Sequence, residues 1–348
     1  MGASWYGIGI SDERLIETEK AVFKFSGVEE DLICAREVRC DEAGNFMRTL
    51  FFGDKKKPKF VLIHGYGGSG VIFYKIVGKL CEYFQVIAVD ILGMGASSRP
   101  QDVTYTTASE ADDYFLAKFD FWLQEMELEQ FYLLGHSYGG YLAGKLACRH
   151  PDKVLKLFLA SSAGVGSYPN FDFDADWAER VEKGQNLPPA SFAWVVRKAW
   201  NQQLTPNSML RFMGPFGSHF ALRRSLNRRF HVLPQEERDA LGAYFPQILL
   251  KPQSTDHCLH LQFQCFMRAV AGLEDRDLLP AFPNPVVFIY GDHDWMRMDI
   301  EGAFRVKQLR HALPTSLHTI PNCGHHLYID NPDHFADTIL SELEEVTH

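Results

Sequence analysis

The sequence predicts an α/β fold in which a doubly wound, mostly parallel sheet carries a helical cap inserted between two of its strands. From residue 60 to about residue 164, short apolar runs typical of buried parallel strands alternate with helical patterns. The alternation then stops for about 115 residues, and comparable apolar runs resume only at 285–290 and 316–321. An interruption of this length is too long for a plain loop, so it predicts an inserted helical segment.

The expected organisation is therefore one core and one cap. The core takes residues 1–164 and 283–348, and the cap takes residues 165–282. The cap segment is rich in Trp, Phe, Leu and Arg, and prolines break its helical patterns. A chain of 348 residues is long enough for this arrangement.

The individual core elements follow from local signals. A cap at Ser11 predicts a helical lead-in, and turn residues at 41–44 predict a hairpin between strands at 33–40 and 46–52. Asn331 and Pro332 predict the start of a final helix that reaches about residue 346. The remaining elements before the cap are strands at 60–63, 86–89, 131–134 and 154–160 and helices at 72–84, 107–126 and 138–150.

Composition and charge restrict the function. The net charge of −9 argues against general nucleic-acid binding, because phosphate contacts need clustered cations. The seven cysteines form no CxxC pair and no metal-ligand spacing, so no metal site is expected. No apolar run reaches the 18 or more residues that span a bilayer, and no signal peptide is recognised. These features predict a cytoplasmic protein, with peripheral attachment to membranes or lipid droplets left open.

The most informative motif is the pentapeptide Gly135-His136-Ser137-Tyr138-Gly139, which follows an apolar strand and precedes a helix. A strand that turns sharply into a helix around G-x-S-x-G is a nucleophile elbow. The turn forces Ser137 into a strained backbone conformation, and glycines at 135 and 139 avoid collisions with the neighbouring backbone. Ser137 is therefore a candidate nucleophile.

A serine hydroxyl needs a histidine that removes its proton and an acid that orients the histidine. With this elbow the acid and then the histidine follow the serine along the chain. Asp294 and His325 each follow a predicted strand, at the sheet edge where strand ends converge. We predict Ser137, Asp294 and His325 as the catalytic residues. Asp292 is expected to be a turn residue, and His326 is the rival base.

The tetrahedral intermediate of acyl transfer needs backbone N–H donors for its oxyanion. The elbow motif predicts one donor from Tyr138 and another from Tyr66, with Gly67 as the alternative to Tyr66. The glycine-rich segment 65–70 lacks the lysine and the spacing of nucleotide-binding loops, so no nucleotide cofactor is expected. The segment 90–99 is expected to shape the floor of the same edge.

Four motifs carry a resemblance to a known family. They are His64-Gly65-x-Gly67-Gly68, Asp90-x-Leu92-Gly93-x-Gly95-x-Ser97-Ser98-Arg99-Pro100, Gly135-His136-Ser137-x-Gly139-Gly140 and His325-His326-x-Tyr328-x-Asp330-x-Pro332. Together they resemble one branch of the α/β-hydrolase superfamily, which contains the lysophospholipid/N-acyl-phosphatidylethanolamine lipase and the coactivator of adipose triglyceride lipase. The resemblance covers residues from about 33 to 345.

This resemblance implies an α/β-hydrolase fold and a serine esterase that needs no cofactor. Its expected reaction is cleavage of an acyl ester of a (lyso)glycerophospholipid or N-acyl phospholipid through an acyl-enzyme. The coactivator carries Asn at the nucleophile position, so Ser137 favours a working enzyme. Two alternatives stay open. The pattern His325-x-x-x-x-Asp330 matches a motif for which lysophosphatidic acid acyltransferase activity has been proposed in this branch, although the triad already needs His325. The other is a non-catalytic regulator of a lipase at lipid droplets.

The cap offers candidates for contact with a lipid substrate. Its aromatic residues can line an apolar cavity for an acyl chain or form the packing of the cap itself; they are Trp177, Trp194, Trp200, Phe212 and Phe216. A local basic cluster suits a phosphate headgroup, because guanidinium groups match phosphate geometry. Its candidate headgroup residues are Arg223, Arg224 and Arg228, with Arg211 and Arg229 nearby. A solvated helix face paired with Glu236 and Glu237 is the alternative interpretation.

Overall fold

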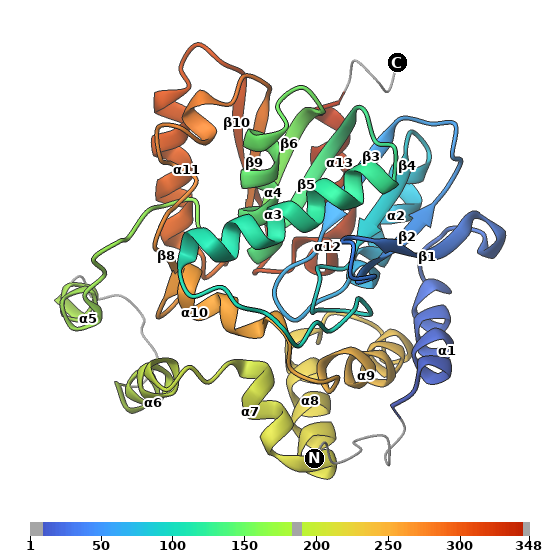
Figure 1. Ribbon diagram of the computed structural model, residues 1–348, viewed down its shortest axis with the longest axis horizontal. Helices are drawn as coiled ribbons and strands as arrows, with labels where there is room; N and C mark the ends of the chain where they lie inside the picture. The colour runs from blue at the N-terminus through green and yellow to red at the C-terminus, as the bar shows by residue number, and fades with distance from the viewer. Residues whose placement is uncertain (1–9, 183–189, 344–348) are drawn as a thin grey trace.

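The computed structural model describes residues 10–182 and 190–343, and it is built around an eight-stranded sheet (Figure 1). The strand order is β1-β2-β4-β3-β5-β6-β9-β10. The first two strands pair antiparallel, and all pairs from β4 to β10 are parallel. The bounds of these strands are β1 Ile33–Arg39, β2 Phe46–Phe52, β3 Lys59–Ile63, β4 Gln85–Val89, β5 Phe131–His136, β6 Val154–Ala160, β9 Val286–Gly291 and β10 Thr315–Ile320. The predicted mostly parallel α/β fold is confirmed.

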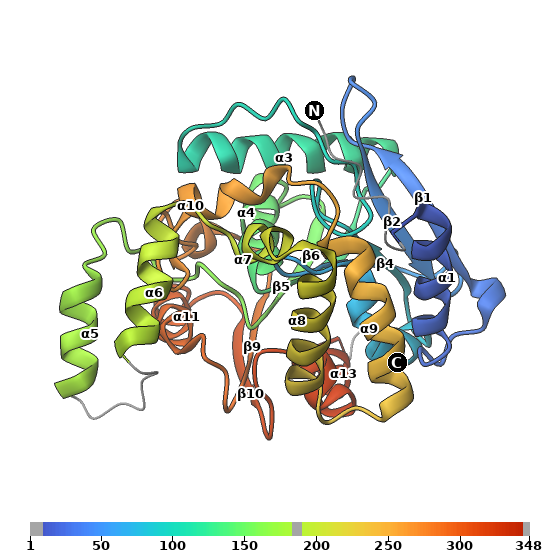
Figure 2. The ribbon, with the colours of Figure 1, turned by 90° about the horizontal axis from the view of Figure 1, so that it is seen from below.

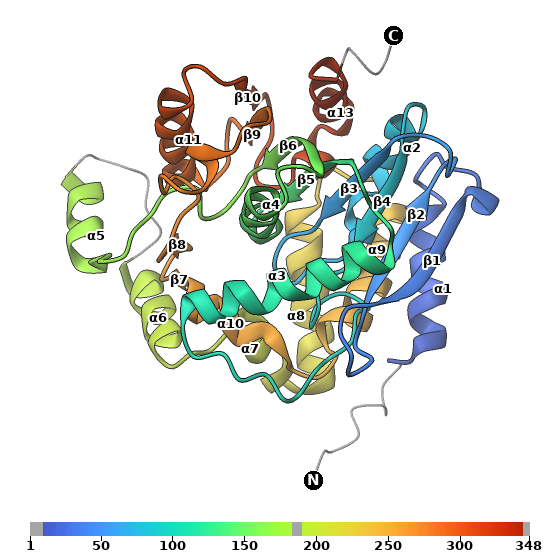
Figure 3. The same ribbon diagram turned by 45° about the horizontal axis from the view of Figure 1, so that its top comes forward.

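Helices cover both faces of the sheet because its central strands are apolar on both sides. Along β3, Val61 and Ile63 pack with α3 and α4 on one face, whereas Phe60 and Leu62 pack with α2 and α13 on the other. This alternation follows from the two-residue period of a strand. Figure 3 shows the sheet between these helices. Their bounds are α1 Asp12–Phe23, α2 Tyr74–Cys81, α3 Ala108–Glu125, α4 Tyr138–Arg149, α11 Arg297–Leu309, α12 Leu327–Asp330 and α13 Pro332–Ser341.

Of the two helix caps that the sequence predicts, one forms in the structure and the other does not. Ser11 caps α1 by accepting a hydrogen bond from the N–H of Arg14, as its sequence predicts. Asn331 precedes α13 but does not cap it, because its side chain donates to the carbonyl of Pro321 instead. The helix α13 ends at Ser341, and the predicted continuation to residue 346 extends beyond the described residues.

Between β6 and β9 the chain forms mainly helices, which lie below the sheet in Figure 1 and in front of it in Figure 2. One of them, α9, also packs against α1, and its Tyr244 donates a hydrogen bond to Ser69 at 2.9 Å. The elements of this segment are α5 Phe173–Glu182, α6 Ala190–Asn201, α7 Pro206–Phe212, α8 Gly214–Arg229, α9 Gln235–Leu249, α10 Cys258–Gln262, β7 Phe263–Gln264 and β8 Arg268–Ala269. The insertion is thus bound to the core at α9.

Candidate active site

The turn between β5 and α4 has the geometry of a nucleophile elbow. Ser137 has φ +55° and ψ −122°, a backbone conformation that side-chain-bearing residues rarely adopt. A Cβ atom at Gly135 would lie 2.3 Å from the carbonyl oxygen of Gly139, and one at Gly139 would lie 2.2 Å from the carbonyl oxygen of His64. Both positions therefore require glycine, as the motif predicts.

The structure brings the three predicted catalytic side chains together. His325 Nε2 lies 3.0 Å from Ser137 Oγ, and His325 Nδ1 lies 3.1 Å from Asp294 Oδ1. Asp294 also accepts a hydrogen bond from the N–H of Met296 at 3.0 Å. Burial opposes the ionisation of Asp294, but these hydrogen bonds and the adjacent His325 hold its pKa below the usual value. The group that faces His325 is therefore a carboxylate.

The two neighbouring residues that were weighed against the triad have other partners. Asp292 accepts hydrogen bonds from the N–H groups of Asn322 and Cys323, both at 3.0 Å, and these bonds lower its pKa to about 2. Asp292 thereby ties the end of β9 to the loop that carries His325. The ring of His326 contacts Arg229 rather than Ser137, and burial lowers its pKa well below the usual value.

A buried polar network holds the loop of His325. His136, inside the elbow motif, hydrogen-bonds through Nε2 to the carbonyl oxygen of His325 at 2.8 Å. The hydroxyl of Tyr328 lies 3.3 Å from His136 Nδ1, and burial keeps His136 neutral by lowering its pKa. Asp330 accepts the N–H of Gly324 at 2.9 Å. In the pattern His325-x-x-x-x-Asp330, the aspartate therefore holds the backbone just before the histidine.

Sequence reasoning did not predict the roles of His136 and Tyr328. Both lie within the family motifs, His136 at the first of the two variable positions of the elbow and Tyr328 three residues after His325. Their occurrence in these motifs was the available signal, but the sequence does not show that the two side chains meet.

The loop after β3 is fixed by His64. His64 Nε2 accepts a hydrogen bond from the N–H of Ile91 at 3.0 Å, so the ring proton resides on Nδ1, which donates to the carbonyl of Gly65 at 2.7 Å. The same carbonyl accepts the N–H of Gly68 at 3.0 Å. In a trans peptide the C=O and N–H groups point in opposite directions, so fixing the Gly65 carbonyl also fixes the direction of the Tyr66 N–H.

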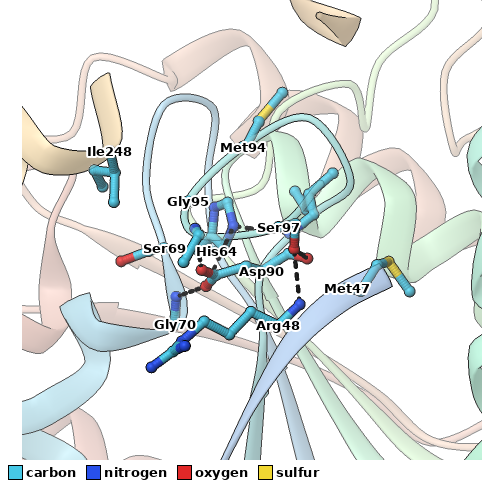
Figure 4. Close-up of polar contacts among 12 residues, drawn as sticks. Met47, Arg48, His64, Ser69, Gly70, Asp90, Met94, Gly95, Ser97 and Ile248 are labelled. Carbon is cyan, nitrogen blue, oxygen red and sulfur yellow. Dashed lines mark hydrogen bonds and ion pairs between the residues drawn. The ribbon is translucent and has the colours of Figure 1, made fainter. Parts of the chain in front are cut away.

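Asp90 connects this loop to the one that follows β4 (Figure 4). Its carboxylate accepts the N–H of Gly70 at 2.6 Å and that of Ala96 at 2.7 Å. The Ser97 hydroxyl donates to the Asp90 carbonyl at 2.7 Å and accepts the N–H of Arg48 at 2.9 Å. The contacts of Asp90 and Ser97 thus join the loop after β3 to the segment 90–99 and to β2.

A cavity of about 610 Å³ opens at Ser137 between the core and the helices α6 to α9. The surface of this cavity is largely apolar, which suits an acyl chain. The lining includes the loop after β3, both histidines of the His325 loop, and Trp295. Its residues from the inserted segment include Val195, Trp200, Met209, Leu222, Ser225, Leu226, Arg229, Phe230, Phe245, Leu249, Phe266 and Met267.

The structure separates the predicted substrate-contact residues. Of the five cap aromatics, Trp200 lines the cavity, whereas Trp177 stacks on Phe173. Phe212 and Phe216 are 93% and 83% exposed, and Trp194 is also exposed. The three predicted headgroup arginines are exposed and do not belong to the cavity lining; they are Arg223, Arg224 and Arg228.

The neighbouring basic residues differ from these three. Arg229, a neighbour of the three in the basic cluster, does line the cavity. Arg211 forms an ion pair with the buried Asp256.

Within residues 10–182 and 190–343, no group of three or more His, Cys, Asp or Glu side chains is placed to hold a metal ion. Across the same residues, no helix combines the length and the apolar character needed to cross a bilayer.

The chain belongs to the alpha/beta hydrolase fold family, whose model matches residues 58–332. Its relatives fit the branch that the motifs predicted. A 1-acylglycerol-3-phosphate O-acyltransferase of Arabidopsis thaliana is 33% identical over 310 residues, covering 85% of this chain and 69% of the relative. A (lyso)-N-acylphosphatidylethanolamine lipase of Mus musculus is 25% identical over 290 residues, covering 83% and 80%.

Solved structures support the same fold. A membrane phospholipase A, described as a bacterial virulence factor, aligns with a TM-score of 0.62 at 23% identity and covers 96% of this chain and 91% of that structure. A naproxen esterase from Bacillus subtilis aligns with a TM-score of 0.64 at 16% identity, covering 96% and 99%. At these identities the likeness extends to the fold alone.

The hydrogen bonds of His64 lead to a test of the oxyanion loop. We expect His64→Ala to lower kcat for a p-nitrophenyl ester by about 10- to 100-fold, because the Gly65–Tyr66 peptide loses its support. An Asn side chain can place an N–H donor near the position of Nδ1, so His64→Asn should recover part of the loss. Thermal unfolding would be measured for each variant. A folded Ala variant with unchanged kcat would show that His64 does not position this peptide.

Proposed function

We propose that this protein is a serine hydrolase that cleaves a carboxylic ester of a (lyso)glycerophospholipid or N-acyl phospholipid through an acyl-enzyme. The main observation that supports this proposal is the hydrogen-bonded series Ser137–His325–Asp294 at the base of a largely apolar cavity. The relatives support the lipid character of the substrate, because their names include a phospholipid lipase and acyltransferases.

In the proposed reaction, His325 first accepts a proton from Ser137 and then donates a proton to the leaving group. Ser137 Oγ bonds to the ester carbonyl carbon while His325 Nε2 takes the serine proton. Asp294 holds the imidazole and stabilises the imidazolium that forms. When the C–O bond to the glycerol oxygen breaks, His325 returns the proton to that oxygen and the acyl group stays on Ser137. Water then attacks the acyl-enzyme by the same steps and releases the fatty acid.

The oxyanion is expected to accept hydrogen bonds from Tyr138 and Tyr66. Tyr138 is the first residue of α4, so its N–H has no acceptor within the helix and lies at the positive end of the helix dipole. Tyr66 lines the cavity beside Ser137, and the His64–Gly65 contact fixes its peptide. We assign Tyr66 rather than Gly67 because this contact acts on the N–H of Tyr66.

A second candidate is acyl transfer to lysophosphatidic acid, which the names of the acyltransferase relatives favour. The acyl-enzyme would be the same, and a glycerol hydroxyl would replace water in the second step. Asp330 is bonded to the backbone of Gly324, so one site would serve both reactions. A non-catalytic regulator would instead form no acyl-enzyme, although it would share the fold.

The nucleophile can be tested with a fluorophosphonate probe. We expect the wild-type protein to be labelled and Ser137→Ala to lose labelling, because the probe reacts with a serine activated by histidine. Ser225→Ala is the matched control, because Ser225 lines the same cavity on α8. It should keep its labelling. Absent labelling of folded wild-type protein, or labelling that survives in Ser137→Ala, would contradict the hydrolase proposal and favour the regulator.

A lipid panel separates hydrolysis from transfer. Purified protein would receive radiolabelled phosphatidylcholine as acyl donor, with and without lysophosphatidic acid as acceptor. We expect free fatty acid as the main product in both cases, and loss of all products in Ser137→Ala. If phosphatidic acid formed in place of fatty acid when lysophosphatidic acid is present, and if Ser137→Ala abolished it, the result would assign the transferase function instead.

A further inference from the structure

The helix α8 presents one side to the cavity and the opposite side to solvent. Its cavity residues are Leu222, Ser225, Leu226 and Arg229, which follow the three- and four-residue spacing of one helix face. Among the described residues that line the cavity, Arg229 is the one lysine or arginine. A fixed positive charge therefore lies in the wall of an otherwise largely apolar cavity.

Two other arginines of the insertion are neutralised by carboxylates, whereas Arg229 is not. Arg211 pairs with Asp256, and Arg197 pairs with Asp174. For Arg229, no described carboxylate is within ion-pair distance. Its guanidinium donates to the ring of His326, which is neutral because burial, Arg229 itself and His325 lower its pKa.

The electrostatic neighbours of Arg229 leave its charge available. Partial desolvation lowers the pKa of Arg229 and the nearby Tyr328 and Asp330 oppose this shift, while part of the side chain stays exposed to solvent. The Oδ2 atom of Asp330 is occupied by the N–H of Gly324. Since an arginine stays protonated under all ordinary conditions, the side chain can offer N–H donors to an anion in the cavity.

The position of Arg229 relative to the reacting atoms sets the chemistry of that anion. Its partner His326 packs beside the catalytic histidine, with 5.4 Å between the centroids of the His325 and His326 rings. In a glycerophospholipid the phosphate and the acyl ester are attached to the same three-carbon unit. An ester carbonyl at Ser137 would therefore carry its phosphate into the neighbourhood of Arg229.

We infer that Arg229 is a specificity-determining residue that binds the phosphate of the substrate headgroup. This inference rests on the proposed function, because it assumes that an acyl ester is bound at Ser137. It also replaces the expectation for Arg223, Arg224 and Arg228, whose side chains do not line the cavity. A guanidinium contributes charge-assisted hydrogen bonds to phosphate, which are stronger than bonds between neutral groups.

The test compares two substrates that differ only in phosphate. We expect Arg229→Met to raise KM for lysophosphatidic acid about tenfold or more, and to change KM for a monoacylglycerol of the same acyl chain less than about twofold. Arg229→Lys should recover part of the loss. Arg228→Met is the matched control, since Arg228 is adjacent and exposed like Arg229 but does not line the cavity. Inhibition by inorganic phosphate would be measured in parallel, to separate affinity for free phosphate from recognition of the whole lipid.

Each outcome decides the inference separately from the proposed function. Equal losses for both substrates would indicate a structural role and overturn the inference, while the hydrolase would stand. If neither substrate is turned over, binding of lysophosphatidic acid to Ser137→Ala, with and without Arg229→Met, supplies the answer. Weaker binding in the double variant would support the phosphate site although the hydrolase proposal had failed, and unchanged or absent binding would overturn it.

A second observation concerns the surface formed by the end of α7 and the solvent side of α8, which we call the outer face. Its large apolar side chains are unusually exposed: Phe212 by 93%, Phe216 by 83% and Phe220 by 71%. Phe216 and Phe220 are four residues apart on α8, and the exposed Arg223 and Arg224 continue the same side of the helix. Figure 2 shows α7 and α8 on the side of the molecule away from the sheet.

We propose that the outer face docks on an anionic lipid bilayer. Phenylalanines beside arginines on one helix face match the interface of such a bilayer, where rings enter the headgroup region and cations meet lipid charge. The cations stand out in a chain of net charge −9. A second copy of the chain is a poorer fit, because it would place arginines against arginines. Docking here would bring the cavity side of the same helix close to its lipid.

Vesicle sedimentation tests this surface. We expect binding to phosphatidylcholine vesicles that contain phosphatidylserine, with an affinity reduced about tenfold or more in Phe216→Ser/Phe220→Ser, because two apolar rings are lost. Arg223→Gln/Arg224→Gln should remove the preference for phosphatidylserine. Phe304→Ser on α11, exposed by 54%, is the control. Hydrolysis of a water-soluble ester should be equal in all variants.

Two results would overturn the docking proposal. One is wild-type binding to vesicles that persists unchanged in the double phenylalanine variant. The other is an absence of vesicle binding by the wild-type protein. In that case, a molecular mass in solution that rises with protein concentration, and no longer does so in the double phenylalanine variant, would identify a second copy of the chain as the occupant.

Discussion

The constraint on which the candidate site depends is the contact of the elbow with the end of β3. A Cβ atom at Gly139 would lie 2.2 Å from the His64 carbonyl oxygen, so α4 can start here only with glycine at this position. This packing holds Ser137 at φ +55°, and it places the start of α4 against the loop that carries Tyr66. The nucleophile and both proposed oxyanion donors are therefore parts of one rigid unit, and the strained backbone is maintained by the surrounding core.

Around that unit, where the strands end, polar side chains hold the loops in place. Asp90 joins the loops after β3 and β4, Asp292 joins the ends of β9 and β10, and His136 joins the elbow to the carbonyl of His325. Each of these side chains bonds to backbone atoms, so it fixes the path of a loop. The placement of His325 then depends on side chains outside the predicted triad, which form a partly buried polar network around it.

The inserted helices form most of the cavity wall that faces the candidate site. Because α8 separates the cavity from solvent, the same helix can contact a substrate with Arg229 and a lipid surface with Phe216 and Phe220. Under the proposed function, the core would carry out the acyl-enzyme chemistry and the insertion would select the substrate. Hydrolysis and acyl transfer would differ only in which hydroxyl reaches the acyl-enzyme, and the triad geometry is compatible with both.

The sequence by itself determined the fold class, the elbow and the order of Ser137, Asp294 and His325, because strand periodicity, glycine requirements and strand ends are properties of short chain segments. Tertiary structure decided which side chains line the cavity. Arg229 lines it and Arg228 does not, although the two are adjacent in sequence, because the rotation of α8 about its axis is set by packing against the core. The meeting of His136 with Tyr328 across 192 positions was equally invisible locally. Such choices depend on contacts between distant segments, which hydrophobic pattern and residue spacing do not encode.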